Sequence, residues 1–532
     1  MKIVFVCAED EIPGVSALSG YMKAHGHEVD LIFDPRQFSR AYIQSNFLSK
    51  LFSREEENLQ RLEEMKPNLI AFSVVTAHYQ WALRFAKKIK VEFPDIPIIF
   101  GGAHPTVVPE VVIKEDYIDY VCVGEGEEAL LELVESLEKG DGNPEIRNIW
   151  FKNDDGVAQS NPLRPLVANL DELPFVDKEL FYKQLPSEYK NNTYFFTSRG
   201  CPFGCTYCCN AELMQLFRGL GKYIRQMSVK RTINELIDIK RKYKPKTFLF
   251  EDDVFTANKE WTKQFLSEYS EKVGIPFTCS GHTRFLSDEI IIRLKEAGCK
   301  MLWFGIQSAS EKMRKDVLNR FERNDSMIKV ADLCHKSGLR FMVDHILNLP
   351  YDTDENIKEA LRLYNTMRPC VINVYPLLYF PKSPIINSSI EYGQLRPEDV
   401  DNINQGKTLL YQGGRLRYRK KDSYRKYALL LTCIPILPKS WVNKIEKSDR
   451  LINFFSRLPI SLITPIKLIL YYRAGYGFLP LGILKIEFSF TKQLLAKKIK
   501  KSLGLGRKKE DVSAERVKKE VKQHQPKMRT HK

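Results

Sequence analysis

The sequence has no uninterrupted run of 18 or more uncharged apolar residues, although 43% of its 532 residues are hydrophobic. A single helix needs about 20 such residues to cross a bilayer, so we predict no membrane-spanning helix. The first residues are also unlike a secretion signal, because three acidic residues at positions 9–11 follow only a short apolar run. We therefore expect a cytoplasmic location.

Cysteine is also too sparse for a disulfide scaffold: there are 11 in the whole chain, irregularly spaced outside one cluster. Disulfide-stapled proteins concentrate cysteines in short chains, so that class is excluded. The length exceeds what one hydrophobic core usually organises, and it predicts two or three domains.

Acidic residues are scarce at the C-terminal end. The segment 491–532 has 15 Lys or Arg against 4 Asp or Glu, which supplies +11 of the formal net charge of +16. Such a tail suits a polyanionic neighbour, either anionic lipid or nucleic acid, and it equally suits a solvated disordered segment. No RNA-binding motif with interleaved aromatic residues accompanies the charge, so we expect no nucleic acid partner.

Short apolar runs alternate with amphipathic helical patterns over residues 1–140. This alternation predicts βαβ units and a doubly wound parallel sheet, in which ligands bind beyond the carboxyl ends of the strands. The expected strands are 2–7, 27–33, 68–75, 96–102 and 120–123, and the expected helices are 15–25, 54–65, 78–93 and 127–137.

Proline and glycine interrupt this rhythm over residues 141–190, which indicates a linker with room for one hairpin. Over residues 191–390 six strand–helix repeats predict an open (β/α)6 barrel with its site at the carboxyl strand ends. The expected strands are 193–197, 247–251, 277–280, 301–306, 340–346 and 371–379.

A C-terminal helical segment is expected over residues 391–490, followed by the basic and disordered tail 491–532. A basic run at 415–426 precedes two apolar stretches, 428–437 and 451–472, which are too short or too interrupted to span a membrane. They suit helices at a membrane interface or core helices of a small cap.

One cysteine cluster follows the first strand of the barrel segment directly. The sequence GCPFGCTYC at 200–208 sets Cys201, Cys205 and Cys208 in a CxxxCxxC pattern, and three thiolates so spaced can converge on one soft metal centre. A structural zinc ion would want a fourth ligand, and Cys209 lies too close to Cys208 in sequence to complete a tetrahedron easily. Three ligands leave one iron of a [4Fe–4S] cluster open for a substrate or cofactor.

With the aromatic Tyr207 before its last cysteine, this pattern resembles the hallmark of the radical S-adenosylmethionine (SAM) superfamily. The resemblance implies that the open iron chelates the amino and carboxylate groups of SAM, and that electron transfer cleaves SAM to methionine and a 5′-deoxyadenosyl radical. It also implies that Tyr207 lies near the adenine. The chemistry would then belong to the cofactor, while the protein positions it and excludes water.

Other positions match the family one at a time. Glu251 and Asp252, after the second strand, resemble the segment that holds the methionine amino group, although acidic residues also favour helix N-termini. Arg284, after the third strand, is the candidate partner of the SAM carboxylate. Gln307 replaces the glutamate of a common Gly-Ile-Glu-Ser segment and can still bond a ribose hydroxyl. Tyr351 replaces the glycine of a Leu-Pro-Gly-Glu-Thr segment, which leaves the backbone geometry there open.

Three stretches of the first unit carry a second resemblance: Ser-Val-Val at 73–75 before Gly-Gly at 101–102, Gly-Gly-Ala-His-Pro-Thr at 101–106, and Gly-Glu-Gly-Glu at 124–127. They resemble elements of the cobalamin-binding domain of the B12-dependent branch, which implies a Rossmann or flavodoxin-like fold. Glycines there suit a bulky corrin because they allow close backbone approach. The Asp-x-His-x-x-Gly motif that gives cobalt a histidine in many cobalamin proteins is missing, so cobalt ligation stays open, and a sheet that only scaffolds the barrel is the alternative. The candidate cobalamin residues are Ser73, Gly101, Gly102, His104, Gly124 and Glu125.

These resemblances together imply a radical SAM enzyme that uses a [4Fe–4S] cluster, SAM and cobalamin to transfer a methyl group to an unactivated carbon. The alternatives are cyclisation, rearrangement or oxidation with the same cofactors and, from another class, a zinc-stabilised nucleic-acid-binding protein. We expect a small or lipid-like substrate and a reductant such as flavodoxin or ferredoxin. The C-terminal segment favours peripheral contact with the inner face of the membrane.

Overall fold

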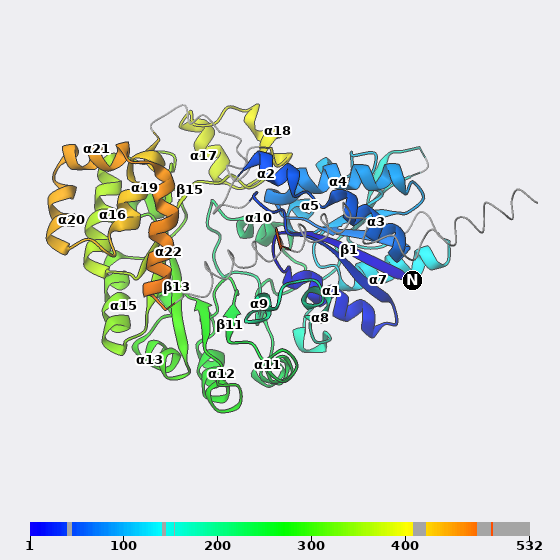
Figure 1. The fold of residues 1–532 in the computed structure, drawn as a ribbon, viewed down its shortest axis with the longest axis horizontal. Helices are drawn as coiled ribbons and strands as arrows, with labels where there is room; N and C mark the ends of the chain where they lie inside the picture. The colour runs from blue at the N-terminus through cyan, green and yellow to red at the C-terminus, as the bar shows by residue number, and fades with distance from the viewer. Residues whose placement is uncertain (40–44, 141–144, 154, 408–421, 476–490, 493–532) are drawn as a thin grey trace, which may run out of the picture.

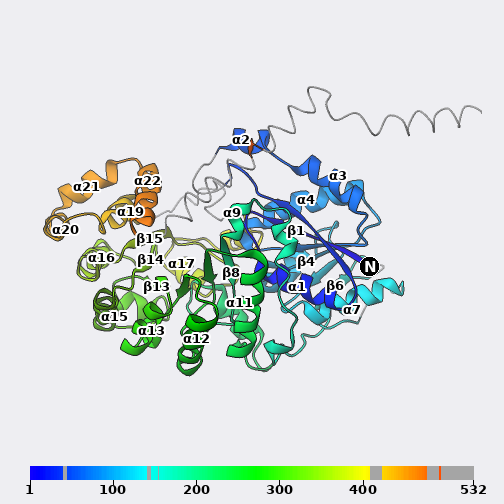
Figure 2. The ribbon, with the colours of Figure 1, turned by 60° about the horizontal axis from the view of Figure 1, so that its bottom comes forward.

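The computed structural model describes residues 1–39, 45–140, 145–153, 155–407, 422–475 and 491–492 (Figure 1). Most of the basic run and nearly all of the tail lie outside the described residues. Two sheets, each covered by helices, form the body of the chain. The last described helices lie at the end of the molecule away from the first sheet, as Figures 1 and 2 both show.

Among the described residues the first sheet has seven strands in the order β2-β1-β3-β4-β5-β6-β7. The first five are parallel, and β6 and β7 add an antiparallel hairpin beside β5. The order 2-1-3-4-5 is that of flavodoxin-like folds, in which ligands bind where the strand order reverses. The strands are β1 (Lys2–Ala8), β2 (Glu28–Asp34), β3 (Leu69–Ser73), β4 (Ile98–Gly101), β5 (Tyr120–Cys122), β6 (Ile149–Lys152) and β7 (Ala158–Ser160).

Both faces of this sheet are buried. Ile3 and Phe5 belong to the core shared with α1 and α7, whereas Val4 and Val6 belong to the core shared with α3 and α4. Successive residues of a strand point to opposite faces, which is why the run at the start of the chain is continuously apolar. The helices are α1 (Pro13–Ala24), α2 (Asn46–Leu51), α3 (Glu55–Met65), α4 (Tyr79–Glu92), α5 (Ala103–Val107), α6 (Pro109–Val112) and α7 (Glu127–Glu138).

The second sheet is open and parallel, with the order β15-β14-β13-β12-β11-β8 within the described ranges. This sheet and the first one confirm the expected fold class of a doubly wound domain followed by a partial barrel. The last strand ends at Pro376 rather than at position 379. The strands are β8 (Asn192–Phe195), β11 (Thr247–Phe250), β12 (Phe277–Ser280), β13 (Cys299–Gln307), β14 (Phe341–Leu347) and β15 (Val371–Pro376).

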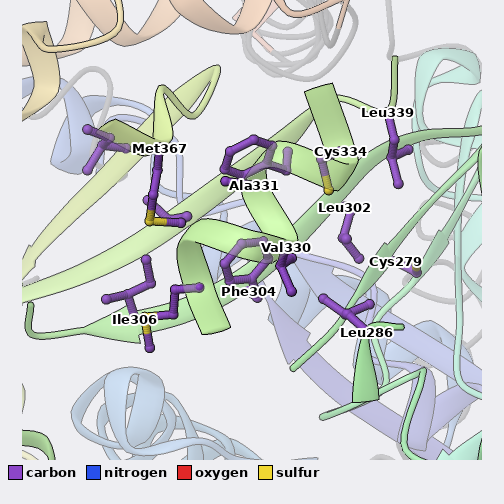
Figure 3. Close-up of a cluster of buried hydrophobic side chains, with 14 of the residues drawn as sticks. Cys279, Leu286, Leu302, Phe304, Ile306, Val330, Ala331, Cys334, Leu339 and Met367 are labelled. Atoms are coloured by element: carbon purple, nitrogen blue, oxygen red, sulfur yellow. The ribbon is translucent and has the colours of Figure 1, made fainter. Parts of the chain in front are cut away.

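Helices cover the outer face of this second sheet (Figure 2). Figure 3 shows one part of the core, where Leu302, Phe304 and Ile306 of β13 meet Val330 and Ala331 of α15. The helices are α11 (Val229–Tyr243), α12 (Lys259–Lys272), α13 (Asp288–Glu296), α14 (Glu311–Asp316), α15 (Asn324–Ser337) and α16 (Asp354–Met367).

The segment 141–190, expected to link the two units, contributes the hairpin β6–β7 to the first sheet and two short helices. Leu180 and Phe181 are buried in the same core as Phe5. Smaller elements flank the barrel strands: α8 (Glu179–Tyr182), α9 (Ser187–Lys190), β9 (Ser198–Arg199), α10 (Cys209–Leu216) and β10 (Arg225–Gln226).

Helices beyond the barrel close its end. Tyr427 and Leu430 of α19 are fully buried in the barrel core, so the first apolar stretch supplies a core helix. Leu470 of α22 packs with Met342 and Val371. No single helix in the described part of the chain is long and apolar enough to cross a membrane, but α21 with the segment Ile460–Arg473 passes the same test as a pair bent by 86°. The helices are α17 (Ile385–Glu391), α18 (Asp399–Asn404), α19 (Ser423–Cys433), α20 (Lys439–Glu446), α21 (Asp449–Arg457) and α22 (Ile463–Arg473).

Candidate functional site

The cysteine loop runs from β9 to the start of α10. Gly200 opens it with φ +87°, and a Cβ there would stand 2.4 Å from the carbonyl oxygen of Tyr223, so only glycine fits. The loop closes on a turn in which the Cys208 amide donates to the Cys205 carbonyl oxygen at 3.0 Å, and α10 begins at the next residue. A distant segment also holds the loop, because the Thr206 amide donates to the Leu318 carbonyl oxygen at 3.2 Å and its hydroxyl donates to the Val317 carbonyl oxygen at 2.6 Å.

The three thiols differ in their surroundings. Burial raises the pKa of Cys201 to about 12. A hydrogen bond from the thiol of Cys209 lowers the pKa of Cys208 to about 7 against the effect of burial, and Asn210 Nδ2 lies 3.7 Å from the Cys208 sulfur. Cys209 thus helps Cys208 to ionise near neutral pH.

Within the described residues no three Cys, His, Asp or Glu side chains are arranged to hold a single metal ion. A structural zinc ion needs four ligands that converge on one point, whereas each thiolate of a [4Fe–4S] cluster binds a different iron. The three cysteines, on which no fourth ligand converges among the described residues, fit the cluster better than the ion.

A buried arginine that no short sequence motif marks lies against the cysteine loop. Arg320 donates from Nη1 to the Tyr207 hydroxyl at 3.1 Å and points the same nitrogen at Cys205 Sγ at 3.9 Å. Its Nη2 donates to the carbonyl oxygen of Gly305 at 2.8 Å and pairs with Glu322. The guanidinium thereby joins the loop to the end of β13.

Glu322 links this arginine to a histidine. His282 Nε2 lies 2.8 Å from Glu322, and the His282 ring stacks on Phe203 of the cysteine loop with centroids 4.0 Å apart. Burial alone would raise the pKa of Glu322, but the hydrogen bond from His282 and the charge of Arg320 lower it to about 2. Glu322 therefore stays ionised and balances the buried guanidinium.

Two acidic residues, Glu251 and Asp252, follow β11, and their side chains have different partners. Asp252 Oδ1 accepts from the amide and the hydroxyl of Thr197, both at 2.9 Å, and from the Ser198 hydroxyl. Its Oδ2 is buried without a protein partner among the described residues. Burial raises the pKa of Asp252 to about 6.

Glu251 makes no side-chain hydrogen bond within the described part of the chain. Burial, with the nearby charges of Asp252 and Asp344, raises its pKa to about 7. Both carboxyl groups therefore keep acceptor oxygens that no described residue uses, and a ligand with N–H donors would satisfy them.

Of the remaining candidates in the barrel, two have a positive φ and the third has an exposed side chain. Gln307 has φ +67° and folds its amide over Gly305, where a Cβ would stand 2.2 Å from Gln307 Nε2. Tyr351 adopts φ +63°, the left-handed conformation that the glycine of the family pattern would adopt at no cost. Arg284 lies in a short 3₁₀ helix after β12 with its side chain exposed, so the buried guanidinium beside the loop is that of Arg320 instead.

A cavity of about 470 Å³ lies between the two units, within the range of small-molecule sites. Five of the six cobalamin candidates line it: Ser73, Gly101, Gly102, Gly124 and Glu125. Lys178 of the connecting segment closes its other side together with residues of the barrel unit, among them Phe196, Ser198, Arg199 and Met227. The loops after β3, β4 and β5 thus meet the start of the barrel as the flavodoxin-like order requires.

The sixth candidate, His104, is not in the cavity lining. Its ring is almost fully buried and packs against Tyr79 with centroids 4.0 Å apart and the ring planes tilted by 34°, and its Nδ1 lies 3.2 Å from the Thr76 hydroxyl. Burial lowers the pKa of His104 to about 3, so the ring is neutral. This arrangement is that of a packed core histidine.

Glu125 bridges the units rather than facing the cavity freely. Its carboxylate oxygens lie 2.7 Å from Arg199 and 2.8 Å from Arg225, and the amide of Val167 donates to it at 2.8 Å. Arg199 also pairs with Glu127 at the start of α7. This cluster of ion pairs connects β5 to the strand that precedes the cysteine loop.

Comparisons with known proteins agree with both halves of this geometry. A family model described as the B12 binding domain matches residues 1–134, and one described as the radical SAM superfamily matches residues 195–364. A solved structure of the methyltransferase TsrM from Kitasatospora setae, with cobalamin and a [4Fe–4S] cluster bound, has a TM-score of 0.63 at 13% identity, covering 90% of this chain and 99% of its own. At that identity the likeness concerns the fold.

Two curated relatives extend the comparison. An uncharacterized methyltransferase of Pyrococcus horikoshii is 31% identical over 57% of this chain and 64% of its own length. The anaerobic magnesium-protoporphyrin IX monomethyl ester cyclase of Rubrivivax gelatinosus is 24% identical over 68% of this chain and 62% of its own. The chain therefore spans a little less than two thirds of the length of either relative.

Proposed function

The chain belongs to the radical SAM superfamily, in the branch with an N-terminal B12-binding domain, and from this premise we propose that it is a cobalamin-dependent methyltransferase. The cofactors of the proposal are a [4Fe–4S] cluster, SAM and cobalamin. When bound, the cluster with SAM supplies a radical that abstracts hydrogen from an unactivated carbon, and cobalamin supplies the methyl group. The observation that carries the proposal is the cavity between the family's two domains, which opens on the segment that leads into the cysteine loop.

In the barrel, Cys201, Cys205 and Cys208 would hold the cluster. The buried Asp252 Oδ2 without a partner, and the unbonded carboxyl of Glu251, support a role for this pair in accepting N–H donors of the SAM methionine moiety. Gln307, on the same strand end that Arg320 contacts, would bond the ribose, and Tyr207 would contact the adenine. Arg320 holds the Tyr207 hydroxyl in place.

In the first domain, Ser73, Gly101, Gly102 and Gly124 would hold cobalamin in the cavity. A Cβ on Gly102 would stand 2.8 Å from the backbone nitrogen and oxygen of Val74, so glycine keeps the loops after β3 and β4 close together. No histidine lines the cavity among the described residues, and His104 instead contacts the Tyr79 ring and the Thr76 hydroxyl. We therefore propose that this domain leaves cobalt without a histidine ligand.

A second candidate function uses the same cofactors for cyclisation without methyl transfer. The similarity to the Rubrivivax cyclase favours it, since that relative covers more of this chain than the Pyrococcus methyltransferase does.

For either candidate function we propose a small or lipid-like substrate and a flavodoxin- or ferredoxin-type reductant. We also propose a cytoplasmic location, with peripheral contact of the C-terminal helices to the inner face of the membrane.

The test is anaerobic purification of the full chain with cluster reconstitution, followed by iron, sulfide and corrin analysis. We expect about four irons per chain and a bound corrin. Incubation with SAM labelled in its methyl group then separates the two candidate functions, because only methyl transfer moves the label into product. Bound zinc without iron would overturn both.

A further inference from the structure

The last three described helices present a surface that the barrel does not cover. α21 and α22 both contact α19, and they bury Ile452, Ile463 and Leu470 on the side that faces the protein. The two helices are bent by 86° relative to each other, so they form an L-shaped outer layer. Figures 1 and 2 show this layer at the end of the molecule away from the first sheet.

The opposite sides of these helices are apolar and exposed. On α22 and the turn before it, Leu462, Ile469 and Tyr472 follow the 3.6-residue period of one helical stripe, and Tyr472 is 68% exposed. On α21, Phe454 is 57% exposed and shares a stripe with Leu451. Large apolar side chains grouped in this way mark a contact surface.

Cations surround this apolar layer. Over 439–473 the sequence has seven Lys or Arg against two Asp or Glu. The exposed cations are Lys439, Lys444, Lys447, Arg450, Arg457 and Arg473. Trp441 of α20, which is 60% exposed, adds an amphipathic aromatic ring of the kind that favours the level of lipid headgroups.

We propose that this α20–α22 surface docks on the face of an anionic lipid bilayer. Apolar side chains on helices that lie flat, flanked by Lys and Arg, are what interfacial helices use: the apolar face enters the acyl boundary and the cations meet the headgroups. A nucleic acid would use the cations but leave the aliphatic stripe in water. A second copy of this chain would place like charges opposite one another.

The docking surface is continuous with the barrel. Tyr472 points outward on α22, whereas the neighbouring Tyr471 donates from its hydroxyl to Asn373 of β15 at 2.7 Å. Asn373 in turn donates to Asp344 of β14 at 3.1 Å. One helix therefore joins the lipid-facing surface to the strands of the barrel, which suits a substrate that arrives from the membrane.

The α20–α22 surface and the anionic lipid specify the peripheral membrane contact that the proposed function includes. The inference rests on the proposed function only for that membrane contact. Cofactor chemistry is not involved. Vesicle binding and methyl transfer can therefore succeed or fail independently of one another.

The experiment is co-sedimentation of the full-length chain with vesicles of phosphatidylcholine alone and of phosphatidylcholine with phosphatidylglycerol. We expect binding to the mixed vesicles only, weakened by salt. The double variant Phe454→Ser/Ile469→Ser should bind about tenfold or more weakly, since two apolar side chains no longer leave water. Phe321→Ser, which changes a phenylalanine that is 70% exposed outside this surface, is the matched control and should bind as the parent does.

A second readout follows the position of the surface directly. Trp441 emission should shift to shorter wavelength on binding mixed vesicles, and the shift should be absent in Trp441→Phe. Equal vesicle binding by the double variant and the parent would overturn the proposal and leave the basic tail as the lipid contact. A change from dimer to monomer in the double variant, without vesicle binding by the parent, would assign the surface to a second copy of the chain.

Discussion

Arg320 and Cys205 lie 115 positions apart in the sequence, yet the guanidinium Nη1 stands 3.9 Å from the thiol sulfur. The same nitrogen donates to the Tyr207 hydroxyl, and Glu322 neutralises the other side of the group. A cluster on this loop would therefore have a guanidinium, balanced by Glu322 on its far side, and its N–H donor beside one of the cluster sulfurs. Both favour the reduced, more negative form of an iron–sulfur cluster.

Replacing Arg320 with Met should consequently lower the reduction potential of the cluster. The loss of one charge-assisted hydrogen bond is worth about 1.4 kcal/mol or more, which is about 60 mV for a one-electron couple. Redox titration monitored by electron paramagnetic resonance measures the change in the SAM-free protein. Arg284→Met removes an exposed arginine and serves as the control, and a potential unchanged in both variants would refute the tuning role.

Cys205→Ala and Cys209→Ala should separate a ligand from a neighbour of a ligand. Cys205→Ala should prevent cluster assembly and SAM cleavage while the first domain stays folded. Cys209→Ala should still assemble the cluster on reconstitution. Before reconstitution, its Cys208 thiol should react more slowly with alkylating agents near pH 7 than that of the cluster-free parent, because the hydrogen bond that lowers its pKa is gone. Iron content and alkylation rates check these outcomes; loss of the cluster in Cys209→Ala would show that the ligand set is different.

The raised pKa of Glu251 predicts a pH-dependent stability. Its ordinary value of 4.5 applies to the unfolded chain and about 7 to the folded one, so folding favours the protonated carboxyl. Its contribution to stability is present below about pH 4.5 and is lost as the pH rises through about 7. In the cluster-free protein, Glu251→Gln should therefore raise the melting temperature relative to the parent at pH 8 but not at pH 5.

Glu260→Gln, on the exposed face of α12, provides the comparison for Glu251. Its melting temperature should track that of the parent across the same pH range. A Glu251→Gln difference of the same size at pH 5 and pH 8 would mean that the carboxyl is not neutralised by burial.

The buried ion pair between Glu11 of the first domain and Lys178 of the connecting segment should be coupled energetically. Lys178 Nζ lies 2.5 Å from Glu11 and 2.6 Å from the carbonyl oxygen of Tyr194, and both charged side chains are about 1% exposed. Lys178→Met or Glu11→Gln should each destabilise the protein by about 3–5 kcal/mol, because each leaves one buried charge alone. The double variant should lose less than the sum, as denaturant unfolding would show; additive losses would contradict the coupling.

Regular elements and the cysteine loop could be predicted because their patterns are local. The continuous apolar run of β1 and the CxxxCxxC spacing lie within a few residues of sequence. Five of the six cobalamin candidates gather at one cavity because parallel strands bring their carboxyl ends to one edge. The hairpin β6–β7 was harder to place, since its β7 residues are all exposed and show no apolar alternation.

The rest of the site depends on contacts between distant segments. Arg320, Glu322 and His282 meet only after the loop, β12 and the segment after α14 have packed together, and no short motif marks them. His104 lies in a segment that matches the family, yet its packing on Tyr79 removes it from the cavity. Arg284 has the expected chemistry but ends in an exposed turn.

Two glycines that line the cavity offer a matched test of the cobalamin site. Gly102 has φ +100°, and a Cβ there would stand 2.8 Å from the backbone of Val74, so Gly102→Ala should cost about 2–4 kcal/mol and spread the loops after β3 and β4. Gly14, near the start of α1, lines the same cavity, and a Cβ there has nothing within 4 Å. Gly14→Ala should therefore keep or slightly raise the stability of the helix.

Cobalamin binding, followed by corrin absorbance after gel filtration, should fall in Gly102→Ala and persist in Gly14→Ala. The comparison separates loop geometry from crowding, because both variants add one methyl group to the lining and only one of them displaces backbone. Equal retention of cobalamin by the two variants would mean that the approach of the loop at Gly102 to Val74 does not shape the site. If only Gly14→Ala lost bound cobalamin, the corrin would lie closer to α1 than to the loops after β3 and β4.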